Sequence, residues 1–81
     1  MSSKIELKNW VRDALRVNGG EASVLTVAKY IWINHESALR TSGDLFYTWQ
    51  YDMRWACTEL RKEGIVEEPV QRGVWKLVAG R

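Results

Sequence analysis

The chain has 81 residues and a formal net charge of +2, from 12 Lys and Arg against 10 Asp and Glu. This length allows a single small domain, residues 1–81, with one continuous core. So small a net charge does not by itself indicate a nucleic-acid-binding protein, and the positions of the basic residues have to decide. The 5 Trp are many for this length. Because large aromatic side chains bury much surface each, we expect most of them in the core.

The cysteine content and the apolar pattern indicate where the protein resides. A single Cys cannot form an intramolecular disulfide, and Cys57 falls on the apolar stripe of a predicted helix, so we expect a buried, reduced thiol. No apolar stretch approaches the roughly 18 residues of a membrane span, and no basic-then-apolar leader opens the chain. We therefore expect a cytoplasmic protein that does not contact a membrane.

The first helix is predicted to begin at Ser3, because Ser3 and Glu6 match the capping box. Asn18 and the pair Gly19-Gly20 are expected to end it, since Gly adopts the left-handed conformation without a Cβ clash. Trp10 lies on the flank of its apolar stripe. That stripe consists of Leu7, Val11, Ala14 and Leu15.

A second helix is predicted from Ser23 to about His35, with an apolar stripe of Val27, Tyr30, Ile31 and Asn34. The β-branched residues at its start also allow a short strand before Thr26, whose hydroxyl would then cap the helix. Trp32 and Ile33 fall away from the stripe. They are interpreted either as rim residues under a long loop or as a contact with a second subunit.

Residues 35–46 are rich in Ser, Thr, Gly and Asp and are predicted to form a connector with at most one helical turn. The third helix is predicted over residues 47–63 and ends before Gly64. Its apolar stripe comprises Trp49, Met53, Ala56, Cys57 and Leu60. Its opposite face carries Tyr51, Arg54, Trp55, Thr58, Arg61 and Lys62.

After Gly64 the pattern changes to that of a β-hairpin over residues 65–78, with PVQRG (69–73) as the turn and Trp75 and Leu77 alternating with Lys76. Three helices followed by a two-stranded hairpin is the order of the winged helix, an α+β fold. In a winged helix the third helix enters the major groove of DNA and the hairpin, or wing, lies beside the backbone.

The carboxyl-terminal half resembles the end of the amino-terminal winged-helix domain of Mrr-type restriction endonucleases. The resemblance covers roughly residues 45–80 and rests on Trp55-Ala56, Leu60, Gly64-Ile65, Arg72-Gly73, Trp75 and Leu77. The family usually has a Thr before its last Gly, where this chain has Val78 and Ala79 before Gly80. No stretch of the 81 residues matches the family's nuclease domain. The resemblance therefore implies a restriction-related or regulatory DNA-reading module and not a nuclease.

No catalytic or metal-binding arrangement is evident. The only adjacent carboxylates, Glu67 and Glu68, lie on the predicted hairpin and are interpreted as solvated charge. His35 is the sole histidine, so neither a Cys-His nucleophile nor a His-rich metal site can be assembled. We expect no enzyme activity, no metal ion, no cofactor and no small-molecule substrate.

Double-stranded DNA is the partner that we expect. Base edges in the major groove would be met by Gln50, Tyr51, Arg54 and Thr58. Phosphates would be met by Arg61, Lys62, Arg72, Lys76 and Lys29. The alternative is a protein-interaction or dimerisation module without DNA binding, which the near-neutral charge and the aromatic residues Tyr51 and Trp55 would suit. A homodimer would be compatible with both.

Overall fold

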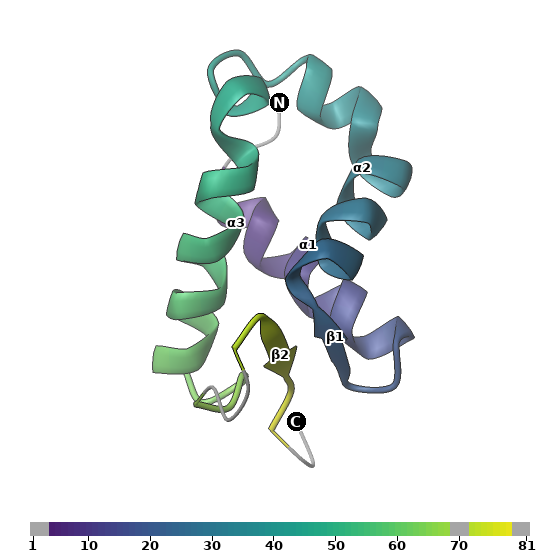
Figure 1. Ribbon diagram of the computed structural model, residues 1–81. Coiled ribbons are helices and arrows are strands. Elements are labelled where there is room, and N and C mark those ends of the chain that lie inside the picture. The colour runs from purple at the N-terminus through teal and green to yellow at the C-terminus, as the bar shows by residue number, and fades with distance from the viewer. Residues whose placement is uncertain (1–3, 69–71, 79–81) are drawn as a thin grey trace.

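The computed structural model describes residues 4–68 and 72–78 of the chain. Its elements are α1 (Lys4–Val17), β1 (Glu21–Ser23), α2 (Val24–Arg40), α3 (Leu45–Lys62) and β2 (Val74–Lys76). Figure 1 shows α2 and α3 beside each other with α1 behind them, and the strands near the carboxyl end of α3. Within the described ranges the fold is α+β, with three helices and a two-stranded antiparallel sheet, as the sequence predicted.

Helix α1 forms as its stripe predicts, because all four stripe residues and Trp10 are buried in the core. The helix ends in a Schellman arrangement, in which the N–H of Gly20 donates to the carbonyl of Leu15 at 2.8 Å and that of Gly19 donates to Arg16 at 3.3 Å. Gly19 has a φ of +79°, which a residue with a Cβ rarely adopts. The predicted capping residue Ser3 lies outside the described residues.

Helix α2 begins at Val24, and Ser23 is its N-cap. The Ser23 hydroxyl oxygen accepts a hydrogen bond from the N–H of Thr26 at 3.1 Å. The predicted short strand is present as β1, but the prediction that Thr26 caps the helix is wrong, because the strand ends three residues earlier. Asn34 was wrongly placed on the buried stripe: it is exposed, and its side-chain amide donates to the carbonyl of Tyr30 at 2.9 Å.

The connector predicted over residues 35–46 is much shorter than expected. Helix α2 continues through a kink at His35 (φ −131°, ψ 19°) to Arg40, and α3 already begins at Leu45. The polar residues that suggested a loop serve the helix instead, since the hydroxyls of Thr41 and Ser42 donate to carbonyls of its last turn. Leu39 is fully buried, which anchors the added turns to the core.

Helix α3 carries the predicted apolar stripe, and each of its five residues is buried. The helix ends at Lys62, one residue before the predicted end. Gly64, with a φ of +77°, stops it, and the N–H of Ile65 donates back to the carbonyl of Leu60 at 2.9 Å.

The predicted hairpin pairing is present in part, but β2 forms its regular sheet with β1, which the sequence did not predict. The register pairs Glu21 with Lys76, Ala22 with Trp75 and Ser23 with Val74. The segment after Gly64 pairs antiparallel with residues 76–78 through the bridge between Val66 and Leu77 and two backbone hydrogen bonds, from the N–H of Glu67 to the carbonyl of Lys76 at 2.8 Å and from the N–H of Val78 to the carbonyl of Ile65 at 2.9 Å. An isolated hairpin is marginally stable, and pairing with β1 satisfies the other edge of β2. Residues 69–71 of the predicted turn lie outside the described residues.

The side-chain alternation predicted for this segment is confirmed. Trp75 is buried, Lys76 is exposed and Leu77 is partly buried against the core. The sheet therefore closes one end of the same hydrophobic core that α1, α2 and α3 share.

Replacement of Leu60 by Ala is expected to lower the free energy of unfolding by about 2–5 kcal/mol, because it leaves a cavity beneath α3. Leu25→Ala is the matched control: Leu25 is 63% exposed, and the same truncation there should change stability by less than about 0.5 kcal/mol. Urea denaturation of both variants measures the difference. Equal losses would mean that α3 is rotated from this placement.

His35 is partly buried at the kink of α2. Its ring stacks on Trp10, with centroids 4.1 Å apart and planes at 9°, and meets the edge of Tyr30 at 6.4 Å. Burial lowers the pKa of His35 below its ordinary value, and this effect outweighs the opposing charges of Asp13 and Glu6. The fold therefore favours the neutral imidazole.

Because the folded-state pKa of His35 is the lower one, the unfolded chain binds this proton more tightly. The free energy of unfolding should have its full value above the ordinary histidine pKa of about 6.5 and should decrease as the pH falls below that value. The His35→Phe variant keeps a ring against Trp10 but cannot titrate. Urea midpoints between pH 7 and pH 5.5, about the range of this titration, should fall more steeply for the natural chain than for the variant. Parallel curves would refute the assignment.

Candidate nucleic-acid interface

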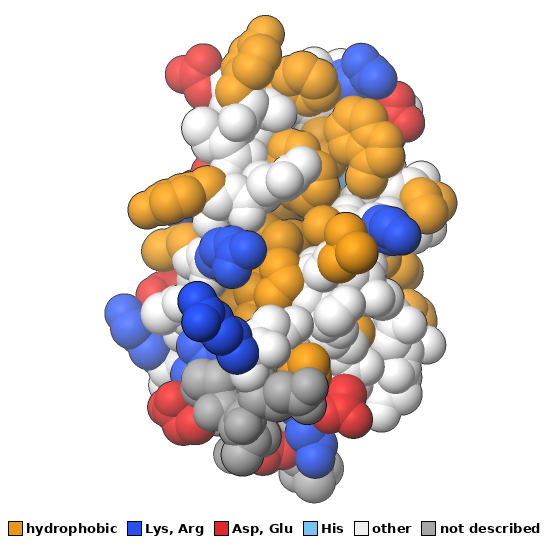
Figure 2. Space-filling model, viewed as in Figure 1, with side chains coloured by type: hydrophobic (Ala, Val, Ile, Leu, Met, Phe, Trp, Pro, Cys, Tyr) orange, Lys and Arg blue, Asp and Glu red, His pale blue; other side chains and the backbone are white. Residues whose placement is uncertain are grey.

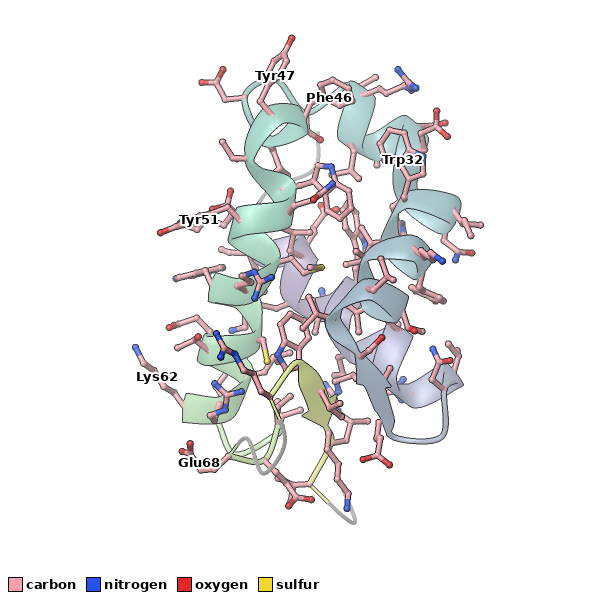
Figure 3. All side chains as sticks on the ribbon, in the orientation of Figure 1. Trp32, Phe46, Tyr47, Tyr51, Lys62 and Glu68 are labelled. Carbon is pink, nitrogen blue, oxygen red and sulfur yellow. The ribbon has the colours of Figure 1, made fainter. Side chains whose placement is uncertain are left out.

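The outward face of α3 is a continuous ridge, which we call the α3 ridge. It consists of Tyr47, Gln50, Tyr51, Arg54 and Thr58, all exposed. Side chains three and four residues apart share one side of a helix, so the ridge follows from burial of the opposite stripe. Figure 3 shows Tyr47 and Tyr51 projecting away from the body of the protein. Four of these residues were predicted as base contacts, and Tyr47 was missed because the predicted helix began there.

Two hollows flank the α3 ridge. On one side Gln50, Tyr51 and Arg54 share a hollow with Val24 and with other residues of the first turns of α2. On the other side the second hollow lies between α3 and the start of α1. It is lined by Lys4, Tyr51, Asp52, Arg54, Trp55, Thr58, Glu59 and Lys62. The ridge therefore protrudes from its surroundings, as a helix must if it is to enter a groove of a duplex.

The polar side chains of the ridge are largely uncommitted. Among the described residues, the guanidinium of Arg54 makes no hydrogen bond or ion pair, and neither does the amide of Gln50. Thr58 donates its hydroxyl proton to the carbonyl of Arg54 at 3.1 Å and keeps its oxygen free to accept. These donors and acceptors are available to a ligand without loss of an internal contact.

Arg61 differs from the other predicted contacts because it is engaged within the protein. Its Nε donates to the carbonyl of Glu67 at 3.1 Å, and its guanidinium approaches the sulfur of Cys57 at 3.6 Å. Burial raises the pKa of Cys57 to about 11, although the nearby Arg61 charge acts in the opposite direction. Arg61 thus ties the segment after α3 to the helix, and Cys57 is the buried thiol that the sequence predicted.

Lys62 and Arg72 remain suitable for phosphate contacts. The Lys62 ammonium lies 3.2 Å from the carboxylate of Glu59, but this pair is largely exposed and therefore weak. Arg72 is exposed and precedes Gly73, whose carbonyl accepts from the N–H of Val24 at 2.9 Å. Because Val24 lines the same hollow as Arg54, the backbone next to Arg72 runs along the edge of that hollow.

Lys29 and Lys76 were both predicted to contact phosphates, but they lie in different parts of the surface. Lys29 is exposed on α2 and shares a pocket with Gln50, so it joins the surface of the ridge. Lys76 is exposed on β2, where it stands opposite Glu21 in the sheet, and it lines none of the hollows that contain ridge residues. Figure 2 shows Lys and Arg side chains gathered over the lower half of α3, with a hydrophobic hollow beside them.

Trp55 is partly buried. The Lys4 ammonium lies 4.5 Å from the centroid of its ring, and the ring packs against the core. Trp55 therefore joins the start of α1 to α3 and belongs to the structure of this region more than to its outer surface.

Neither metal-ligand clusters nor membrane-spanning helices are found in the described ranges. No group of three or more His, Cys, Asp or Glu residues could hold a metal ion there. No helix there is both long and apolar enough to cross a membrane.

Comparison with known proteins adds no relative. No protein-family model, curated protein or solved structure matches this chain.

The two arginines of α3 should respond differently to truncation. Arg61→Ala removes internal hydrogen bonds and should lower the free energy of unfolding by about 1–2 kcal/mol. Arg54→Ala, on the same helix, should change stability by less than about 0.5 kcal/mol. Thermal and urea unfolding of both variants measures this contrast. If Arg54→Ala were the more damaging, the guanidinium would not be free.

Proposed function

We propose that this chain is a non-catalytic DNA-binding module of the winged-helix type, with α3 in the major groove and residues 65–78 as the wing. The observation that carries the proposal is the α3 ridge, on which Gln50 and Arg54 protrude between two hollows without a side-chain partner among the described residues. These two side chains can meet the edges of bases without loss of an internal contact.

The chemistry of the ridge suits base edges. Arg54 offers paired N–H donors for the O6 and N7 of guanine, and Gln50 offers one donor and one acceptor for adenine. Thr58 keeps its hydroxyl oxygen free to accept at the next position along the helix. The three residues span a little over two turns of α3, so they would lie along one groove.

The flanking cations suit the phosphates on either side. Lys62 lies at the carboxyl end of the ridge, Lys29 lies across the hollow on α2, and Arg72 lies where the chain returns to β2. Such contacts position a protein on the duplex but carry no sequence information.

The resemblance to Mrr-type domains supports the fold more than the chemistry. Leu60 and Trp75 are buried, Trp55 and Leu77 are partly buried, and Gly64 ends α3. These motif residues therefore hold α3 and the sheet in place. The element order and the pairing of β1 with β2 support a winged helix, and restriction-related or regulatory use is an extension of that resemblance.

A protein-interaction module remains the second candidate, because large apolar side chains are exposed. Leu25 and Ile33 on α2 are 63% and 76% exposed, and Tyr47 and Tyr51 on α3 are 82% and 78% exposed. Such residues are enriched at contact surfaces. In this alternative Ile33→Asp would change the assembly state and duplex DNA would not bind.

Arg54→Ala is expected to weaken binding to a preferred duplex by about 1–3 kcal/mol and to reduce discrimination between sequences, because a base-edge contact is lost. Arg72→Ala should weaken all duplexes alike and make the dependence of log K on log salt shallower by about one unit. Titrations at two salt concentrations with selected and random duplexes measure both effects.

Arg16→Ala is the matched control, since Arg16 is exposed on α1 beside Asp13 and outside the ridge. It should leave both affinity and salt dependence nearly unchanged. The proposal would be abandoned if random duplex at low salt gave no detectable binding and if the substitutions of Arg54 and Arg72 were as silent as that of Arg16.

A further inference from the structure

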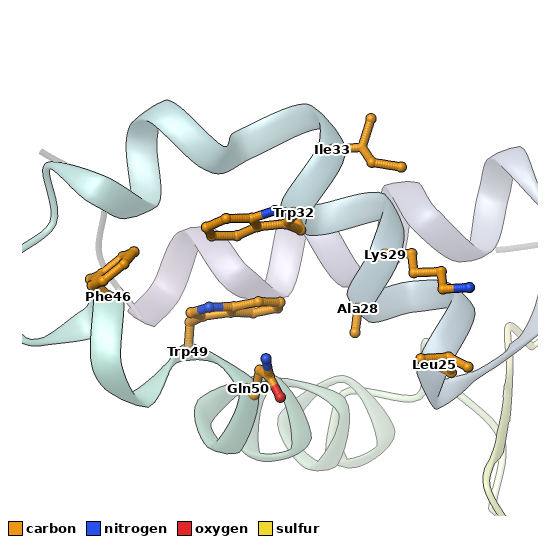
Figure 4. A pocket seen from close by; sticks show the side chains of 8 residues that line it. All are labelled: Leu25, Ala28, Lys29, Trp32, Ile33, Phe46, Trp49 and Gln50. Carbon is orange, nitrogen blue, oxygen red and sulfur yellow. The ribbon is translucent and has the colours of Figure 1, made fainter.

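An aromatic groove lies between α2 and α3, beside the ridge but distinct from it. Its volume is about 650 Å³, which is within the range of roughly 300–1,000 Å³ typical of small-ligand pockets. Figure 4 shows the groove with Trp32, Phe46 and Trp49 at one end and Leu25 at the other. Figure 2 shows hydrophobic side chains along the same hollow, open to solvent.

Two indoles face each other across this groove. Trp32 from α2 and Trp49 from α3 are nearly parallel, with planes at 9° and centroids 6.2 Å apart (Figure 4). A flat ring inserted between two others needs roughly 7 Å, twice the carbon–carbon contact distance of about 3.5 Å. Because the centroid distance is the upper limit of the separation between the two planes, the rings would have to move apart by about 1 Å or more. Trp32 is the ring that would move, since it is partly buried whereas Trp49 is buried.

The polar groups of the groove are few and separated from each other. The amide of Gln50 lies beside Trp49, whereas the ammonium of Lys29 lies on the far side of Ala28 from the indoles (Figure 4). No acidic residue lines the groove. Arg40 lies 5.4 Å from the Trp32 ring and 5.7 Å from the Phe46 ring but does not line the groove, and its Nε is 2.7 Å from a carboxylate oxygen of Glu36. Among the described residues, Lys29 is the cation that lines the groove.

We infer that this groove binds a single unpaired nucleotide, with the base between Trp32 and Trp49, its hydrogen-bonding edge toward Gln50 and its phosphate toward Lys29. Each part of the ligand meets a group of matching chemistry. A planar base stacks on aromatic rings, an amide both donates to and accepts from a base edge, and an ammonium attracts a phosphate. The sugar supplies the separation between the two ends.

The same chemistry has two sources, a free mononucleotide or an unpaired nucleotide within a strand. The test titrates the chain with adenosine, with adenosine monophosphate, with a short single-stranded DNA and with blunt duplex DNA. Tryptophan fluorescence, excited where bases do not absorb, and calorimetry report binding. We expect the monophosphate to bind more tightly than the nucleoside, with quenching from the stacked indoles.

Three variants locate the ligand. Trp32→Leu should weaken binding of the monophosphate by about 5- to 150-fold, the loss expected for one base–aromatic stack. Lys29→Gln should weaken binding of the monophosphate several-fold and leave binding of the nucleoside unchanged, because the substitution removes only the contact with the phosphate. Gln50→Ala should weaken both. Arg16→Gln, at an exposed arginine of α1 outside the groove and the ridge, is the matched control and should change neither.

The outcomes are distinguishable from those of the duplex experiment. Binding of the single strand but not of the monophosphate would support the site with a strand as its source. The inference is overturned if neither binds to the folded natural chain at millimolar concentration, or if Trp32→Leu and Lys29→Gln leave affinity unchanged. Sedimentation showing that a second copy covers the groove would also overturn it. Duplex binding that persists while these ligands fail would refute only the groove.

Discussion

The packing of α3 on α1 is the contact from which the remaining features of this protein follow. Met53, Ala56 and Cys57 are buried toward α1, where Leu7 and Ala14 are completely buried. Helix α3 is in closer contact with α1 than with α2. Because one face of α3 is fixed in this way, the opposite face must project into solvent, which produces the α3 ridge. Because α2 packs less closely on α3, the groove lined by Trp32 and Trp49 stays open between them.

The helical parts of the core could be predicted because a helix buries residues with a period of 3.6. The stripes of α1 and α3 were predicted residue by residue for this reason. The short connection between α2 and α3 could not be predicted, because Thr and Ser are common in loops. Only the structure shows that the hydroxyls of Thr41 and Ser42 donate to carbonyls of α2. The pairing of β1 with β2 was also missed, since it depends on packing between distant parts of the chain.

The residues of the candidate site also differ in whether the sequence alone could reveal them. Gln50, Arg54 and Thr58 could be found from sequence, because an exposed face is the complement of a buried one. The engagement of Arg61 with Glu67 could not, since it depends on the path of the chain after α3. The pairing of Trp32 with Trp49 likewise needs the relative placement of two helices, and Trp32 by itself looked like a rim residue.

The small net charge bears on how the two proposed sites would act together. Lys29, Lys62 and Arg72 would give about three phosphate contacts, so electrostatic affinity would fall with roughly the 2.7th power of salt concentration. One copy held in this way would bind duplex DNA weakly at physiological salt. Base stacking between Trp32 and Trp49 depends little on salt and would add affinity where an unpaired base is present. Because Gln50 belongs to both the ridge and the groove, a nucleotide held in the groove would compete with an adenine edge for the same amide. Lys29 is likewise assigned to both modes, so a nucleotide in the groove would gain stacking affinity while the contacts of Gln50 and Lys29 with a duplex would be lost.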